Sequence, residues 1–203
     1  MGLIGTALEF GMVLDADVEI AVLQLHGLHN VVIRGGTADG QTGLHQRLPE
    51  IVVEFVAVAV IAFARFVAGM ADANSGEFDP DSRHKVIDFL PDQSDETDKG
   101  GTLRLGAYPC RVVPGTQMHR VYGKPDISER HRHRYEFNND FREALSKAGL
   151  TISGTSPDNY IVETVELEGN DFYIGVQYHP EFKSRPNKPH PLFLGLVEAA
   201  LKR

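Results

Sequence analysis

Residues 172–182 read FYIGVQYHPEF. The apolar run Phe172–Tyr178 predicts a strand, and His179 and Glu181 follow at its end, two residues apart. If the chain stays extended, both side chains point to one face, so Glu181 can accept a hydrogen bond from one imidazole nitrogen while the other faces a nucleophile. Taken alone, such a pair is more often an incidental surface contact than half of a catalytic triad.

The rest of the second half alternates strand and helix signals. A helix is expected after Asn139 or Asp140, with Gly149 as its stop, and another from about Pro191 to Leu201. Strands interspersed with helices and a return hairpin predict an α/β sandwich with a mostly parallel central sheet. The further strand-like runs are Thr102–Val113, Arg132–Phe137, Leu150–Ser153 and Tyr160–Leu167.

Composition limits the classes of function. A chain of 203 residues has the size of one ordinary domain, and its formal charge of -8 excludes a general binder of nucleic acid or of anionic membranes. Small molecules or another protein are the expected partners. The single cysteine, Cys110, excludes an internal disulfide and fits a reducing compartment, and Met1–Gly11 lacks the basic flank of a secretory signal. A cytoplasmic protein is therefore predicted.

One apolar stretch, Ile51–Met70, has the length of a membrane span. Glu54 and Arg65 interrupt it, and each would cost about 2.5 to 3.5 kcal/mol near a bilayer centre. The pattern is better explained by a buried strand followed by a buried helix.

The chain changes character near residue 75. No lysine precedes Lys85 and no tyrosine precedes Tyr108, whereas the first segment is rich in Val, Ala, Leu, Ile and Gly. Its short apolar runs, Val18–Leu25 and Val31–Ile33, are compatible with strands or short helices. The asymmetry points either to one two-part domain or to an N-terminal part of different origin.

A series of longer motifs, in order and with ordinary spacing, resembles the C-terminal glutamine amidotransferase domain of CTP synthase. The resemblance covers about residues 59–203. The motifs are AVIAFAR (Ala59–Arg65), ANSGEFDP (Ala73–Pro80), GGTLRLGAYPC (Gly100–Cys110), ERHRHRYEFNN (Glu129–Asn139), GTSPD (Gly154–Asp158), QYHPEFKSRP (Gln177–Pro186) and HPLF (His190–Phe193).

The resemblance implies a class I glutamine amidotransferase-like sandwich and a Cys-His-Glu triad that hydrolyses glutamine. It assigns His179 as the base that activates the thiol and then protonates the leaving ammonia, with Glu181 orienting it. Glu77 and Arg134 match glutamine-binding positions, where Arg134 would pair with the substrate α-carboxylate and Glu77 with its ammonium group.

In the family, ammonia passes to a separate amidoligase domain that aminates UTP to CTP at the expense of ATP, a ligase reaction of pyrimidine biosynthesis. That domain is absent here, so ATP and Mg are not expected to bind this chain, and GTP is the activator of the family enzyme. The implied partners are glutamine and an amidoligase domain or synthase subunits.

Two alternatives apply to the histidine- and arginine-rich run. On composition alone, Arg130, Arg132 and Arg134 form a solvated strand face, and only the motif favours a substrate role for Arg134. His131 and His133 lack the further ligand spacing of a metal site, so no metal site is predicted.

The nucleophile of the family is missing. In the family this cysteine sits on a strand-to-helix elbow with the sequence Gly-Ile-Cys-Leu-Gly-Met-Gln, just before the AVI run. Counting back without gaps from that run aligns the elbow with Ile51–Ala57 and its cysteine with Val53. Both elbow glycines are also replaced in this chain. Cys110 matches a non-catalytic family position and is predicted to be a buried structural thiol.

Two functions remain open. The first is the amidotransferase portion of a CTP synthase, inactive as this chain. The second is a non-catalytic regulatory or structural paralogue that binds glutamine, nucleotide or synthase subunits. In either case residues 1–58 are a divergent or mis-framed segment, and residues 59–203 are the C-terminal part of the amidotransferase domain.

Overall fold

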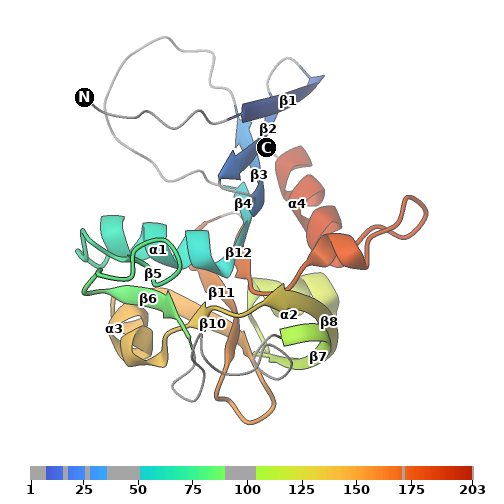
Figure 1. The fold of residues 1–203 in the computed structure, drawn as a ribbon. Helices are drawn as coiled ribbons and strands as arrows, with labels where there is room; N and C mark the ends of the chain where they lie inside the picture. The colour runs from blue at the N-terminus through green and yellow to red at the C-terminus, as the bar shows by residue number, and fades with distance from the viewer. Residues whose placement is uncertain are drawn as a thin grey trace, which may run out of the picture.

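The computed structural model describes residues 8–15, 18–25, 28–35, 51–89, 104–170 and 172–202. Within these residues the chain forms a sheet of nine strands and a second sheet of three (Figure 1). The large sheet has the order β1 (Leu8–Asp15), β2 (Val18–Leu25), β3 (Leu28–Gly35), β4 (Ile51–Phe55), β12 (Phe172–Val176), β11 (Val162–Leu167), β10 (Leu150–Thr155), β7 (Arg104–Val112) and β8 (Asp126–His133). The small sheet has the order β5 (Asn74–Ser75), β6 (Lys85–Asp88) and β9 (Glu136–Phe137).

The α/β class is confirmed, but the prediction of a mostly parallel sheet is wrong for these strands. In the large sheet β4 and β12 run parallel, and every other described pair of neighbours is antiparallel. The reason lies in the connections. Strands β1 to β3 and β10 to β12 follow one another through short links, and a short link reverses the chain, whereas parallel neighbours need a crossover.

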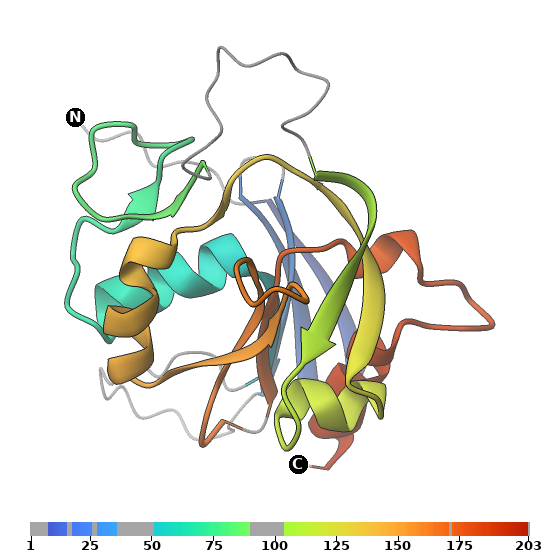
Figure 2. The ribbon, with the colours of Figure 1, turned by 90° about the horizontal axis from the view of Figure 1, so that it is seen from below.

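Helices cover the large sheet on both faces, α1 (Val56–Phe66) and α3 (Arg142–Lys147) on one side and α2 (Gln117–Tyr122) and α4 (Pro191–Leu201) on the other (Figure 2). Each face has its own apolar core. Strand β12 contributes to both, because alternate side chains of a strand point to opposite faces: Tyr173 packs with α1, and Ile174 and Val176 pack with α2 and α4.

Helix α1 begins directly where β4 ends, so the prediction of a strand followed by a helix in Ile51–Met70 is confirmed. Its buried residues recur at the spacing of a single helix face: Val56, Ala59, Val60, Phe63 and Ala64. No helix in the described part of the chain has the length and apolar character needed to cross a membrane.

The close approach of α1 to the sheet depends on Gly175 of β12. A β-carbon added there would lie 2.9 Å from the Ala59 Cβ and 3.0 Å from the Val165 Cγ2. Glycine is therefore required by packing at this position.

The two predicted helices of the second half are present. Helix α4 spans Pro191–Leu201, with Pro191 in its first turn and the His190 ring accepting from the Leu192 amide. The helix before Gly149 is a 3-10 turn, η1 (Asn139–Phe141), continued by α3, and Asn138 caps it in place of the predicted Asn139 or Asp140.

Helix α2 was not predicted from the sequence. Thr116 accepts from the His119 amide at its N-terminus, and Gly123 ends it in the left-handed conformation. From β11, the Glu166 carboxylate accepts from the Gln117 and Met118 amides at 3.0 and 3.2 Å. A tertiary contact thus completes the cap.

Candidate functional site

The predicted pair of His179 and Glu181 is in contact. The chain leaves β12 through the buried residues Gln177 and Tyr178, and His179 Nδ1 lies 2.8 Å from Glu181 Oε1. The contact arises differently from the extended geometry that we expected. His179 is extended, but a 3-10 turn, η2 (Pro180–Phe182), begins at the next residue and brings the carboxylate back onto the ring.

The contact fixes the chemistry that His179 can perform. A carboxylate can only accept, so Nδ1 carries the proton of the neutral ring and Nε2 keeps a lone pair. The His179 ring stacks on Phe182 at 4.7 Å between ring centroids, and its backbone amide donates to the Arg130 carbonyl at 2.8 Å. A ring held in this way is suited to act as a general base through Nε2.

The junction of β4 and α1 lies next to the end of β12, three residues before His179. Phe55, the last residue of β4, is in register with Val176, and α1 starts at Val56. A strand-to-helix junction is the local structure on which elbow nucleophiles sit. Val53, the residue that the ungapped count aligned with the nucleophile, is in register with Ile174, two residues before the strand ends.

Cys110 occupies a different strand, β7, opposite Ile127 of β8. Its side chain is buried, and burial raises the pKa of the thiol far above its ordinary value. A thiol in this state is neither nucleophilic nor accessible, which agrees with a structural cysteine.

Strand β8 presents two different faces. Glu129 and His131 point inward and are 3% and 2% exposed, whereas Arg130 and Arg132 are exposed. Together with Arg185, these two arginines line a hollow beside the predicted pair. The full lining is Leu105, Gly106, Arg130, His131, Arg132, Glu181, Phe182 and Arg185.

The two predicted glutamine-binding residues lie outside that lining. Arg134 is exposed just after β8, with its guanidinium 5.6 Å from the centre of the Tyr135 ring. Glu77 is exposed in the turn after β5, where its amide donates to Ser75 Oγ at 3.2 Å. The structure thus brings His179 and Glu181 together, and Arg134 and Glu77 remain predictions.

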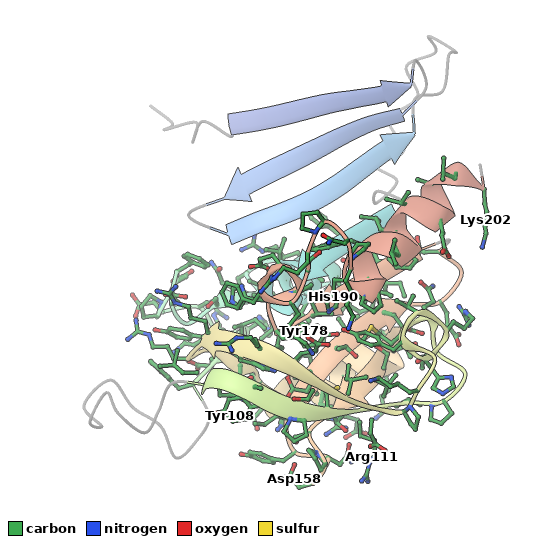
Figure 3. The ribbon with its side chains drawn as sticks, turned by 90° about the vertical axis from the view of Figure 1, so that its right-hand side faces the viewer. Tyr108, Arg111, Asp158, Tyr178, His190 and Lys202 are labelled. Atoms are coloured by element: carbon green, nitrogen blue, oxygen red, sulfur yellow. The ribbon has the colours of Figure 1, made fainter. Side chains whose placement is uncertain are left out.

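A group of polar side chains around the buried Glu129 holds the segment after η2 against β8. Glu129 lies 3.2 Å from Lys183 Nζ and 3.4 Å from His190 Nε2. The Tyr122 hydroxyl joins Glu129 and the Tyr178 hydroxyl, and Figure 3 shows Tyr178 and His190 close together in the interior. Burial alone would raise the pKa of Glu129, but the contacts with His190 and Lys183 hold it below its ordinary value.

A second buried group was missed by the sequence analysis. Arg104 Nη2 donates to Glu163 Oε1 at 2.7 Å, and Arg104 Nη1 lies 3.5 Å from Glu136 Oε1. Gln177 Nε2 donates to Glu136 Oε2 at 2.5 Å. Arg104, Glu136 and Gln177 all lie inside motifs that carried the family resemblance, which was the available signal. We call these four residues, with His131 and His133, the buried cluster.

His131 and His133 bond to each other, with 2.9 Å between His131 Nδ1 and His133 Nε2. Among the residues that the structure describes, no group of three or more His, Cys, Asp or Glu side chains is placed to hold a metal ion.

Comparison with known proteins settles the family. The family model for glutamine amidotransferase class-I matches residues 56–199, which begin at the first residue of α1 and include the His179–Glu181 pair and both buried groups. The chain belongs to the class I glutamine amidotransferase family.

Among its relatives are several bacterial CTP synthases. The CTP synthase of Carboxydothermus hydrogenoformans is 50% identical over 188 residues, covering 88% of this chain and 35% of the relative. That of Chloroflexus aurantiacus is 59% identical over 142 residues, covering 70% of this chain and 26% of the relative. The chain therefore spans about a third of the length of the curated relatives that it matches.

A solved structure agrees with the amidotransferase assignment. The glutaminase domain of Trypanosoma brucei CTPS with bound acivicin superposes with a TM-score of 0.67 and 38% identity, covering 72% of this chain and 57% of that one. The predicted resemblance to the amidotransferase domain of CTP synthase is confirmed.

Proposed function

We propose that this chain is the glutamine-hydrolysing portion of a CTP synthase and that its present sequence cannot hydrolyse glutamine. The observation that carries the first part is the His179–Glu181 contact of 2.8 Å inside a family match over residues 56–199. The absence of a usable thiol supports the second part, because the chain has one cysteine and that one is buried in β7.

In this proposal His179 performs the proton transfers. In an intact site, a thiol at the junction would attack the side-chain amide carbon of glutamine, and His179 Nε2 would take the thiol proton and give it to the departing ammonia. Glu181 keeps the ring in the tautomer in which Nε2 is the accepting nitrogen. Water would then hydrolyse the thioester through the same histidine.

Substrate binding rests on charge. Arg134 would form a charge-assisted pair with the α-carboxylate of glutamine, and Glu77 would accept from its ammonium group. Ammonia released by an intact site would serve an amidoligase domain that converts UTP to CTP. That domain, as partner, belongs to the two thirds of the relatives' length that this chain does not span.

Binding and hydrolysis are tested separately. Calorimetry should detect L-glutamine binding to the parent chain, and Arg134→Ala should weaken the affinity at least about tenfold, because a charge-assisted hydrogen bond is lost. Arg111→Ala, a change of an exposed arginine in β7 that lies outside the hollow, is the matched control and should bind as the parent does. Equal weakening in both variants would contradict the role given to Arg134.

Ammonia release from glutamine should stay at the level of a blank. Val53→Cys alone should not restore it, since Glu54 and Phe55 would still replace the family's leucine and glycine. Activity that survives Cys110→Ser but disappears with His179→Ala would overturn the proposal, because it would require another nucleophile. Activity lost on Cys110→Ser would show that this thiol is catalytic.

The second candidate is a non-catalytic module that binds glutamine, nucleotide or synthase subunits, and the loss of both elbow glycines together with the cysteine favours it. Rebuilding residues 51–57 as Gly-Ile-Cys-Leu-Gly-Met-Gln separates the two. Restored hydrolysis supports a disrupted synthase, with residues 1–58 mis-framed or divergent, and no hydrolysis despite glutamine binding supports the module. Resequencing codons 1–60 tests the frame directly.

A further inference from the structure

The buried cluster lies between the two segments that the proposed function requires to act together. Gln177 precedes His179 by two residues, and Glu136 follows Arg134 by two residues. Their side chains meet at 2.5 Å, and both are buried, with 7% and 1% of their surfaces exposed. This contact is therefore a short, water-excluded link between the base and the predicted carboxylate-binding arginine.

The side-chain NH2 group of Gln177 donates two hydrogen bonds in this link. Its Nε2 donates to Glu136 Oε2 and also to the Val162 carbonyl at 2.7 Å, while its backbone amide donates to the Glu163 carbonyl at 2.9 Å. With three bonds in place, Gln177 has little freedom to move, and its orientation is set by the acceptor on Glu136.

The histidines of the cluster hold the Arg134 segment in the same way. The Tyr135 carbonyl can only accept, so His133 Nδ1, 3.1 Å away, carries a proton and donates to it. His133 Nε2 is then the acceptor for the proton on His131 Nδ1. A directed chain of hydrogen bonds thus runs from β8 to the residue that follows Arg134.

The charges of the cluster favour this arrangement near neutral pH. Burial lowers the pKa of His131 to about 2 and that of His133 to about 3, with the Arg104 cation as the next cause, so both rings are neutral. Burial raises the pKa of Glu136 to about 7, and that of Glu163 is also raised. Arg104 is paired at hydrogen-bond distance with Glu163, which leaves the Glu136 carboxyl to Gln177.

We propose that Glu136 and Gln177 are positioning residues, whose buried hydrogen bond holds the His179 end of β12 in a fixed place relative to Arg134. The inference rests on the proposed function for the roles of His179 and Arg134. Neither positioning residue touches substrate in this proposal: each acts by holding the backbone from which a site residue projects.

The first test measures placement without any substrate. In the full chain, Glu136→Leu removes the acceptor, and Glu136→Gln keeps one. Amide hydrogen exchange at His179, which donates to the Arg130 carbonyl, is compared with exchange at Ala148, whose amide bonds within α3. We expect Glu136→Leu to speed exchange at His179 relative to Ala148 at least about tenfold, and Glu136→Gln to leave the ratio as in the parent.

The control is a second buried carboxylate. Glu166 is 4% exposed and caps α2, so Glu166→Leu should lower global stability without changing the His179 to Ala148 ratio. The proposal is overturned if Glu136→Leu leaves the ratio unchanged, or if Glu166→Leu changes it equally. Gln177→Met, which removes the donor and keeps the side-chain volume, gives the same test should Glu136→Leu not fold.

The second test measures glutamine affinity by calorimetry. Glu136→Leu should weaken binding at least about tenfold, and Glu136→Gln should bind like the parent. If the parent itself binds no glutamine, the proposed function fails while the exchange ratio still decides the positioning role. Equal affinity in parent and Glu136→Leu would contradict the coupling of the two segments.

Discussion

Glu136→Gln should change how stability depends on pH, because it removes one buried titrating group and keeps its shape. Glu136 is 1% exposed, and burial raises the pKa of its carboxyl from the ordinary 4.5 to about 7. The Arg104 cation acts in the opposite direction and the Glu163 carboxylate in the same direction as burial. His133 Nδ1 lies 3.6 Å from Glu136 Oε1, beyond hydrogen-bond distance, and donates its proton to the Tyr135 carbonyl.

The sign of this pH dependence follows from the number of protons that the folded and unfolded chains bind. Between pH 4.5 and 7 the folded parent keeps a proton on Glu136 that the unfolded chain releases, so the contribution of Glu136 to the free energy of unfolding falls as pH rises through this range. Each pH unit corresponds to about 1.4 kcal/mol. From pH 5.5 to pH 8 the parent should therefore lose about 2 kcal/mol relative to Glu136→Gln.

The measurement is urea unfolding of both proteins at several pH values, followed by circular dichroism. The histidines titrate in both proteins, so their contribution cancels in the difference between variant and parent. A difference that stays constant with pH would refute the reasoning. If the free energy of unfolding of the parent rises relative to that of the variant as pH rises, the Arg104 cation affects the pKa of Glu136 more strongly than burial does.

Three further predictions concern stability and reactivity. Burial lowers the pKa of His131 and His133 to about 2 and 3, so the contribution of each ring to the free energy of unfolding falls as pH falls below 6.5, opposite in sign to that of Glu136, and between about pH 4 and 6 the parent should lose about 1.4 kcal/mol per pH unit relative to His131→Asn in urea titrations. An unchanged slope would contradict this. Gly175→Ala should destabilise by about 1 to 3 kcal/mol in thermal unfolding, since its Cβ would meet the Ala59 Cβ at 2.9 Å; an unchanged midpoint would count against the packing argument. Cys110 should react with iodoacetamide only in denaturant, because burial raises its pKa, and rapid labelling of the folded chain would disprove this.

The parts of the fold that were predicted are those with a local signal. Helix α4 has Pro191 in its first turn and an apolar side throughout, and its bounds agree with the prediction. Helix α2 has six residues and a cap completed by Glu166 from β11, so its sequence alone gave no periodic signal. The direction of the strands was predicted wrongly because neighbours in a sheet are fixed by tertiary contacts, which local patterns do not contain.

The same distinction applies to the site. His179 and Glu181 are two residues apart, so their contact was predicted from spacing, but the 3-10 turn η2 that makes the contact was not predicted. The run Arg132–Phe137, read as one strand, is divided at Arg134 and Tyr135 because Phe137 pairs with Ile87 in the small sheet. The buried cluster gathers Arg104, Glu163 and Gln177 from separate strands, and no spacing rule brings them together.

The parallel pairing of β4 with β12 has a consequence for synthesis of the chain. Ile51 and Phe172 are in register although about 120 residues separate them, so closing this loop has a large entropic cost and occurs late in folding. During translation α1 leaves the ribosome long before β12 does, so it can pack on β6 early, but its contacts with β11 and β12 cannot form until the C-terminal segment is made. Growing chains that stop short of residue 172 should therefore need chaperones. The large sheet can be completed only when the last thirty or so residues of this chain, which contain β12, have been made.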